Sequence, residues 1–159
     1  ALAARTNPRG IKGGIKDALV GADVFIGLSV ANIISKEDIQ SMAKAPIVFA
    51  MANPVPEISP EDALAAGASV VGTGRSDYYN QINNVLAFPG IFKGALSVRA
   101  KDITPAMKRA AAQAIADFTG DITKERIIPG AFEQGLGEAV AKAVAEAAIE
   151  DGVAKVVTK

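Results

Sequence analysis

Residues 47–72 read IVFAMANPVPEISPEDALAAGASVVG and place a strand, a capped helix and a second strand in close succession. The apolar run at the start ends at Asn53, because the proline that follows lacks a ladder donor and disfavours helical backbone before it. Ser59, followed by proline and two acids, is a helix start, and Gly67 is a helix stop. The apolar residues resume at 69–72. Two strands joined by so short a helical connection predict a parallel sheet.

A further strand is predicted upstream of this unit. Residues 23–28, DVFIGL, form a continuous apolar run typical of a strand buried on both faces. Ser35 stands three residues before Asp38, which is the pattern of a helix N-cap with an acid in the first turn. Strands that alternate with short capped helices predict an α/β fold, a partial doubly wound (Rossmann-like) parallel sheet. Ligands of such sheets bind at the carboxyl ends of the strands.

The remainder of the chain is predicted to be a helical C-terminal cover. Residues 82–98 have apolar residues near helical spacing, with Pro89 as a kink or a restart in the middle. An alanine-rich helix is predicted to begin at Thr104 and to end near Gly120. A last helix is predicted for 136–150. The alanine runs in these helices allow close helix packing.

Composition excludes several classes of protein. The 159 residues suit one compact unit, and the 17 basic residues are balanced by 17 acidic ones, so nucleic acid is not an expected partner. The chain has no Cys and no His, which removes disulfides, thiolate metal sites and the commonest general base. No stretch approaches the roughly 20 apolar residues that cross a membrane, so we expect a soluble cytoplasmic protein.

Three uncharged amides fall near the predicted strand ends. Asn53 follows the second strand, while Asn83 and Asn84 follow the third and open the next helix. Taken singly, Asn53 is simply a turn residue, and Asn83 and Asn84 are a helix cap with a solvated neighbour. Taken together they favour a binding site, because the ends of adjacent parallel strands surround one crevice. Neutral amides can hold a small carboxylate or a carboxamide without adding charge.

Other polar residues nearby have simpler interpretations. Arg75 and Asp77 are predicted to form a local ion pair that stabilises their loop. Glu57 is interpreted as the solvated end of a turn. Tyr78 and Tyr79 are predicted to pack rather than to react.

Several motifs together resemble one enzyme family. They are DVFIGLS at 23–29, VFAMANPVPE at 48–57, TGRSD at 73–77 and NQINNVLAFPGIF at 80–92. The chain, from about residue 5 to about residue 155, resembles the dinucleotide-binding domain of bacterial-type malic enzymes. These enzymes oxidise L-malate with NAD or NADP and decarboxylate the oxaloacetate formed, giving pyruvate and CO2 with a divalent metal.

The resemblance implies roles for particular residues. It implies that Asn53 contacts the substrate and the nicotinamide end of the cofactor, and that Asn83 faces the nicotinamide ribose or carboxamide. It implies that Asn84 holds the malate carboxylate. The residues implied to line the cofactor where its nicotinamide half crosses the strand ends are Ser29, Val30 and Ala31.

The resemblance also implies that residues 1–159 are the C-terminal portion of a dinucleotide-binding domain. The family's catalytic Tyr and Lys, its acidic metal ligands and its glycine-rich phosphate turn would lie upstream, and no G-x-G-x-x-G follows a strand in this chain. No catalytic or metal-binding residue is therefore predicted here. The chain alone is expected to be inactive, Mg or Mn is expected to bind outside it, and the full-length protein is expected to be a homo-oligomer.

Two alternatives stay open. One is a non-catalytic nucleotide-binding or regulatory module of Rossmann-like fold, because a fold alone does not fix a function. The other is a different two-domain dehydrogenase acting on a small acid. The choice between NAD and NADP depends on a residue about twenty positions beyond the glycine turn, so the sequence leaves it open.

Overall fold

The structure is a computed structural model that describes residues 5–156. The chain divides into two compact units, which we call unit 1, up to Tyr78, and unit 2, from Tyr79 onward. Each unit has an apolar core of its own, which is why two units are found where the composition predicts one. The portion of a dinucleotide-binding domain predicted from the sequence covers residues 1–159, and of these, residues 1–4 and 157–159 lie outside the described residues.

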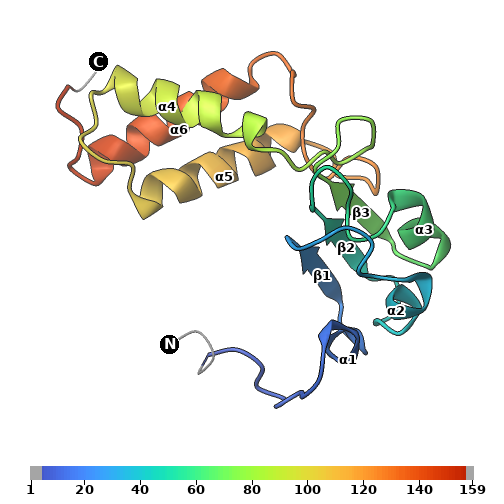
Figure 1. Cartoon of the computed structure of the whole chain (residues 1–159). Coiled ribbons are helices and arrows are strands. Elements are labelled where there is room, and N and C mark those ends of the chain that lie inside the picture. The colour runs from blue at the N-terminus through green and yellow to red at the C-terminus, as the bar shows by residue number, and fades with distance from the viewer. Residues whose placement is uncertain (1–4, 157–159) are drawn as a thin grey trace. The chain divides into compact units, whose positions relative to one another are not determined.

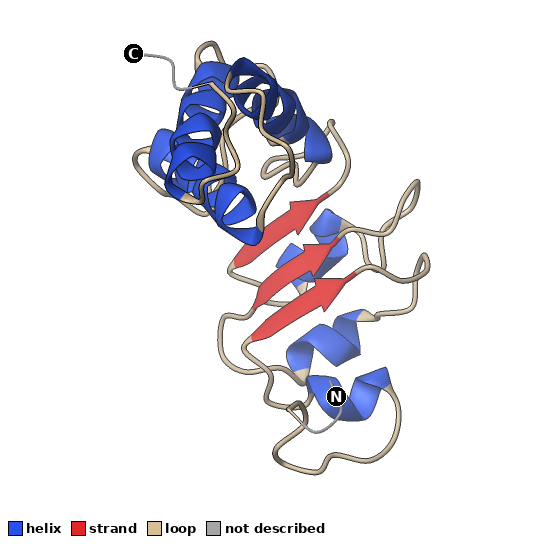
Figure 2. Cartoon of the chain, turned by 90° about the vertical axis from the view of Figure 1, so that its left-hand side faces the viewer, coloured by secondary structure: helices blue, strands red, loops and turns tan. Residues whose placement is uncertain are grey.

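Unit 1 is built on a parallel sheet, as predicted (Figure 2). The strands are β1 (Val24–Gly27), β2 (Ile47–Ala50) and β3 (Val70–Thr73). They lie in the order β1, β2, β3, and each pairs in parallel with the next. The register places Gly27 opposite Ala50 and Ala50 opposite Thr73. The carboxyl ends of the three strands therefore lie level at one edge of the sheet.

Three short helices accompany the strands: the first precedes β1, and each of the other two connects one strand to the next. They are α1 (Ile15–Leu19), α2 (Lys36–Gln40) and α3 (Pro60–Ala65). The predicted cap of α2 is confirmed, because the Ser35 hydroxyl accepts from the Asp38 N–H and the Asp38 carboxylate accepts from the Ser35 N–H. The predicted cap of α3 is confirmed as well, since the Ser59 hydroxyl accepts from the Asp62 N–H. These caps satisfy helix N–H groups that have no partner within the helix.

The sheet carries its core on one face. Phe25, Val48 and Val71 are buried there with side chains from the connecting helices. The alternate residues of β1 are exposed, with Val24 at 45% and Ile26 at 61%. The prediction that β1 is buried on both faces is therefore wrong for the described structure. A continuous apolar run specifies a strand, but it does not show which faces are covered.

Unit 2 is helical. Its described residues form the short 3-10 helix η2 (Asn84–Leu86) and the helices α4 (Phe88–Ser97), α5 (Pro105–Thr119) and α6 (Leu136–Glu150), the last three labelled in Figure 1. The boundaries predicted for α5 and α6 are confirmed. Of the kink or restart predicted at Pro89, the structure shows the restart: η2 ends at Leu86, and α4 begins at Phe88 with Pro89 in its first turn. Proline suits a first turn because its missing N–H is not needed there.

Helices α4 and α6 approach each other closely through small residues. A Cβ added to Gly90 would lie 2.5 Å from the Val140 Cβ, and one added to Gly94 would meet the carbonyl oxygen of Ala141. Val140 and Val144 are fully buried beneath this contact. The close packing predicted from small residues is thus present, with glycine on one helix facing alanine and valine on the other.

Candidate functional site

The predicted cofactor-lining residues follow β1 directly, in the loop of Ser29, Val30 and Ala31. All three are exposed. Asn53 follows β2 and is exposed too, and its peptide bond to Pro54 is cis. Because β1 and β2 end at the same edge of the sheet, these two loops leave it side by side. Unit 1 therefore brings together Asn53 and the loop after β1, as the sequence predicts.

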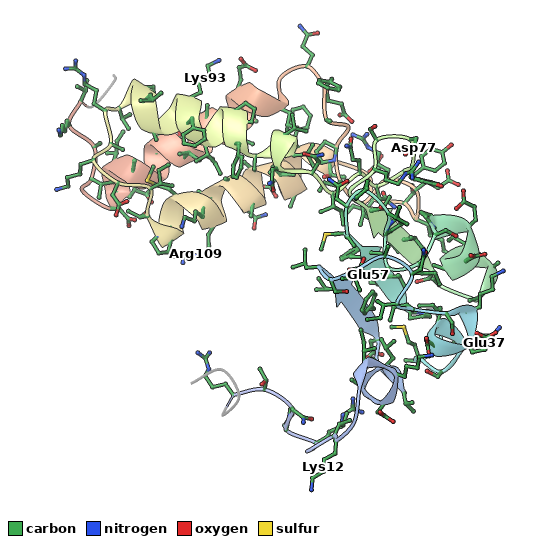
Figure 3. All side chains as sticks on the ribbon, in the orientation of Figure 1. Lys12, Glu37, Glu57, Asp77, Lys93 and Arg109 are labelled. Atoms are coloured by element: carbon green, nitrogen blue, oxygen red, sulfur yellow. The ribbon has the colours of Figure 1, made fainter. Side chains whose placement is uncertain are left out.

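The buried side chain of Glu57 accepts hydrogen bonds from both of these loops. Its side chain is 0% exposed, and its Oε1 accepts from the Ser29 N–H at 2.7 Å and from the Ser29 Oγ at 3.1 Å. Its Oε2 accepts from the Ala52 N–H at 3.0 Å. The interpretation of Glu57 as a solvated turn end is therefore wrong. Figure 3 labels it inside unit 1, whereas Glu37 of α2 is on the outside.

The buried carboxylate of Glu57 is stabilised as an anion by N–H groups. Burial raises its pKa, but the N–H donors of Ser29 and Ala52 outweigh burial and leave that pKa below its ordinary value. Within residues 5–156, no Lys or Arg forms a salt bridge with it. The carboxylate also needs Gly27, because a Cβ at that position would lie 2.5 Å from its Cδ.

Backbone hydrogen bonds complete the connection between the two loops. The Asn32 N–H donates to the Pro56 carbonyl oxygen at 3.1 Å, and the Ile34 N–H donates to the Glu57 carbonyl oxygen at 3.1 Å. Asn32 has a φ of 55°, a left-handed conformation that asparagine tolerates better than most residues. The loops after β1 and β2 are thus fixed to each other by side-chain and backbone bonds.

The two remaining amides belong to unit 2. The Asn83 Oδ1 accepts from the Val85 N–H at 3.0 Å and caps η2. This confirms the cap considered for Asn83, and a cap made through Oδ1 does not use the Nδ2 donor. Asn84 is the first residue of η2 and is exposed, like Asn83.

Asn80 is a structural residue that the sequence interpretation missed. It is 6% exposed, its Nδ2 donates to the Lys124 carbonyl oxygen at 2.8 Å, and its Oδ1 accepts from the Ile127 N–H at 2.9 Å. These bonds tie the segment that precedes Asn83 to the loop before α6. Nothing in the local sequence distinguishes Asn80 from the exposed amides nearby, because its partners lie more than forty residues away.

The loop after β3 contains the predicted ion pair. The Arg75 Nε and Nη2 donate to the Asp77 carboxylate at 2.9 and 2.6 Å, and this bond lowers the pKa of Asp77. The Arg75 guanidinium also lies 5.3 Å from the centroid of the Tyr78 ring, and the Tyr78 hydroxyl donates to the Glu61 carboxylate. Tyr79 is 72% exposed, so the prediction that it packs is wrong. An exposed pair of this kind organises a loop and adds little stability.

The described residues do not form a divalent-metal site. Over residues 5–156 there is no group of three or more His, Cys, Asp or Glu side chains that could hold a metal ion. Over the same residues, no helix has the length and apolarity needed to cross a membrane. Each unit, taken by itself, exposes neutral amides, whose donors and acceptors suit carboxylate or carboxamide groups.

Comparison with known proteins identifies the family. Residues 15–149 match the family model described as "Malic enzyme, NAD binding domain". The chain is 60% identical over 153 residues to the bifunctional malic/malolactic enzyme of Bacillus subtilis (strain 168), covering 95% of this chain and 37% of that one. It is 53% identical over 152 residues to the NAD-dependent malic enzyme of Geobacillus stearothermophilus, covering 94% and 32%.

A solved structure agrees with these relatives. The malic enzyme from Pyrococcus horikoshii Ot3 superposes with a TM-score of 0.91 at 49% identity, covering 95% of this chain and 35% of that one. The chain belongs to the malic enzyme NAD-binding domain family, which confirms the resemblance and the Rossmann-like α/β class. The relatives include enzymes named as NAD-dependent and as NADP-dependent. The chain spans about a third of the length of the first relatives it matches.

Proposed function

We propose that this chain forms the nicotinamide side of an enzyme that converts L-malate and NAD(P)+ to pyruvate, CO2 and NAD(P)H. The observation that carries the proposal is the exposure of three neutral amides on fixed backbone, Asn53 after β2 and Asn83 and Asn84 at η2. The names of the relatives favour this enzyme over a non-catalytic nucleotide-binding module.

Each amide has a proposed role that suits its position. Asn84 donates its exposed Nδ2–H to the malate carboxylate, and Asn53 contacts the substrate and the nicotinamide end of the cofactor. Asn83, whose Oδ1 is held by the Val85 N–H, uses its Nδ2 toward the nicotinamide ribose or carboxamide. The residues that line the nicotinamide half of the cofactor are Ser29, Val30 and Ala31.

The contribution of this chain to the reaction is orientation. When bound, NAD(P)+ would supply the hydride acceptor for oxidation of malate at C2, and the oxaloacetate formed would lose CO2 to give pyruvate. Holding two reactants in one geometry can supply roughly 7–11 kcal/mol of a barrier. Neutral amides suit this task, because they bind carboxylate and carboxamide without opposing the charge change at the nicotinamide ring. We place the acid–base residues, and the Mg or Mn that assists decarboxylation, outside this chain.

A product balance tests the proposal. The full-length enzyme that carries this chain is incubated with L-malate, a divalent metal and either NAD+ or NADP+. We expect pyruvate, CO2 and reduced cofactor in a ratio of about 1:1:1, as the chemistry of hydride transfer and decarboxylation requires. Reduced cofactor without CO2 would indicate a different two-domain dehydrogenase, and the absence of both products would contradict the proposal.

A second activity is suggested by one relative. The Bacillus subtilis enzyme, 60% identical to this chain, is named for malolactic as well as malic activity. We propose that the same product assay be read for lactate, which forms when malate loses CO2 without net oxidation. Lactate without net reduced cofactor would show this activity, and pyruvate alone would exclude it under the assay conditions.

The cellular location and the oligomeric state of the enzyme are proposed from its similarity to the malic enzymes. We propose a cytoplasmic homo-oligomer that acts on the small molecules malate and pyruvate, without nucleic acid or membrane partners. Cell fractionation and light scattering of the full-length protein test the two parts separately. Recovery with membranes would contradict the first part, and a monomer at assay concentration would contradict the second.

A further inference from the structure

We propose that Glu57 is a positioning residue for the dinucleotide, an inference that rests on the proposed function. Its single side chain reaches both the loop after β1 and the loop after β2. Two of its three side-chain hydrogen bonds come from Ser29, in the loop assigned to the cofactor. The third comes from Ala52, the residue that precedes Asn53.

These bonds fix backbone rather than only filling space. Oε1 holds the Ser29 N–H at 2.7 Å, and Oε2 holds the Ala52 N–H at 3.0 Å, so one rigid carboxylate plane sets the separation of the two loops. The backbone bonds from Asn32 to Pro56 and from Ile34 to Glu57 close the other side of the connection. Asn53 and the loop after β1 therefore move as one body when Glu57 is in place.

Two features that disfavour stability occur together at this position. Burying a carboxylate is costly unless it is fully hydrogen-bonded, and glycine inside a strand is weaker than a residue with a side chain. Glu57 is buried, and Gly27 of β1 must lack a Cβ to admit it. Departures of this kind from local stability rules concentrate at functional sites, which favours a role in ligand positioning.

The test compares Glu57→Gln with wild type in the full-length enzyme. Glutamine keeps the shape of glutamate, but its NH2 group must oppose the N–H of Ser29 or of Ala52. We expect the KM for NAD(P)+ to rise at least about tenfold, with a smaller change in kcat, because leaving a buried donor unsatisfied has this scale of effect. The Kd of NAD(P)H, followed by its fluorescence, should rise by a similar factor.

Two controls separate positioning from general destabilisation. Glu37→Gln removes the same charge from an exposed residue of α2 and should leave the KM for the cofactor within about twofold of wild type. Gly27→Ala forces the Glu57 carboxylate to move and should raise the same KM. In the double variant with Glu57→Gln, the two effects should be far from additive, because both act through one side chain. If Glu57→Gln does not fold, Glu57→Asp replaces it, since the shorter acid keeps the charge but cannot reach both loops.

The outcomes separate the role of Glu57 from the proposed function of the enzyme. A folded Glu57 variant with cofactor KM and Kd within about twofold of wild type overturns the inference and leaves Glu57 a stability residue. Additive effects of the Gly27 and Glu57 variants overturn it as well. Wild-type enzyme that binds NAD(P)H but does not oxidise malate refutes the proposed function, while the Kd still tests Glu57. Wild-type enzyme that binds no dinucleotide refutes both.

Discussion

Replacing Gly94 by alanine should destabilise unit 2, although alanine is the better helix former. Gly94 lies inside α4, where alanine alone would contribute about 1 kcal/mol of helix propensity. The added Cβ would meet the carbonyl oxygen of Ala141 and would lie 2.9 Å from the Val144 Cβ. Overpacking of this kind costs about 1–3 kcal/mol, and the upper value applies because a backbone oxygen cannot rotate away. We expect a net loss of about 2 kcal/mol.

Gly137→Ala is the matched control for this effect. Gly137 lies in the first turn of α6, and a Cβ added there has no heavy atom within 4 Å. The same substitution should therefore stabilise unit 2 by up to about 1 kcal/mol. The two variants should differ by about 3 kcal/mol, which corresponds to Tm values at least about 10 °C apart in a unit of this size.

Urea unfolding followed by far-UV circular dichroism measures both variants, because the long helices dominate that signal. The denaturant midpoint gives the change in free energy of unfolding when the slope is unchanged. Finding Gly94→Ala as stable as Gly137→Ala would refute the close approach of α4 and α6. It would mean that the helices can separate by enough to admit a methyl group at little cost.

Two further predictions concern polar contacts of unit 2. The Arg126 Nη1 and Nη2 donate to the Glu133 carboxylate at 2.7 and 3.1 Å. This ion pair lowers the pKa of Glu133 from 4.5 to about 2, so the stabilisation that it gives the folded state is present above pH 4.5 and is lost as the pH falls toward 2. Glu133→Gln should flatten the pH dependence of unfolding over that window, and an unchanged slope would contradict the ion pair. Asn80→Ala should lower the free energy of unfolding by about 2 kcal/mol, since two buried hydrogen bonds are lost. A loss below about 0.5 kcal/mol in urea would contradict that role.

Much of the fold could be predicted because its signals are local. Ser35 and Ser59 are followed by acids that complete their caps, and the starts of α2 and α3 agree with them. The strands are short apolar runs bounded by turn residues, and the helices between them predict their parallel pairing. The bounds of the alanine-rich α5 and α6 could also be predicted from local residues.

What could not be predicted depends on distant partners. Glu57 follows two prolines and looks like part of a solvated turn, but Ser29, twenty-eight residues earlier, supplies the donors that allow its burial. Asn80 is held by residues in the loop before α6. Exposure of Val24 and Ile26 depends on which faces of the sheet are covered, and the composition of β1 does not encode that. Of the candidate amides, Asn53 and Asn84 are exposed as a binding role requires, and Asn83 is both exposed and a cap.

The most direct test of the central claim is the kcat/KM for L-malate of Asn84→Asp in the full-length enzyme. The substitution keeps the shape of the side chain, removes its N–H donors and adds a negative charge at the position proposed to bind the malate carboxylate. We predict a loss of at least about a hundredfold, with the exposed control Gln40→Glu of α2 close to wild type. An Asn84→Asp enzyme with unchanged kcat/KM for malate would contradict the claim that neutral amides of this chain hold the substrate.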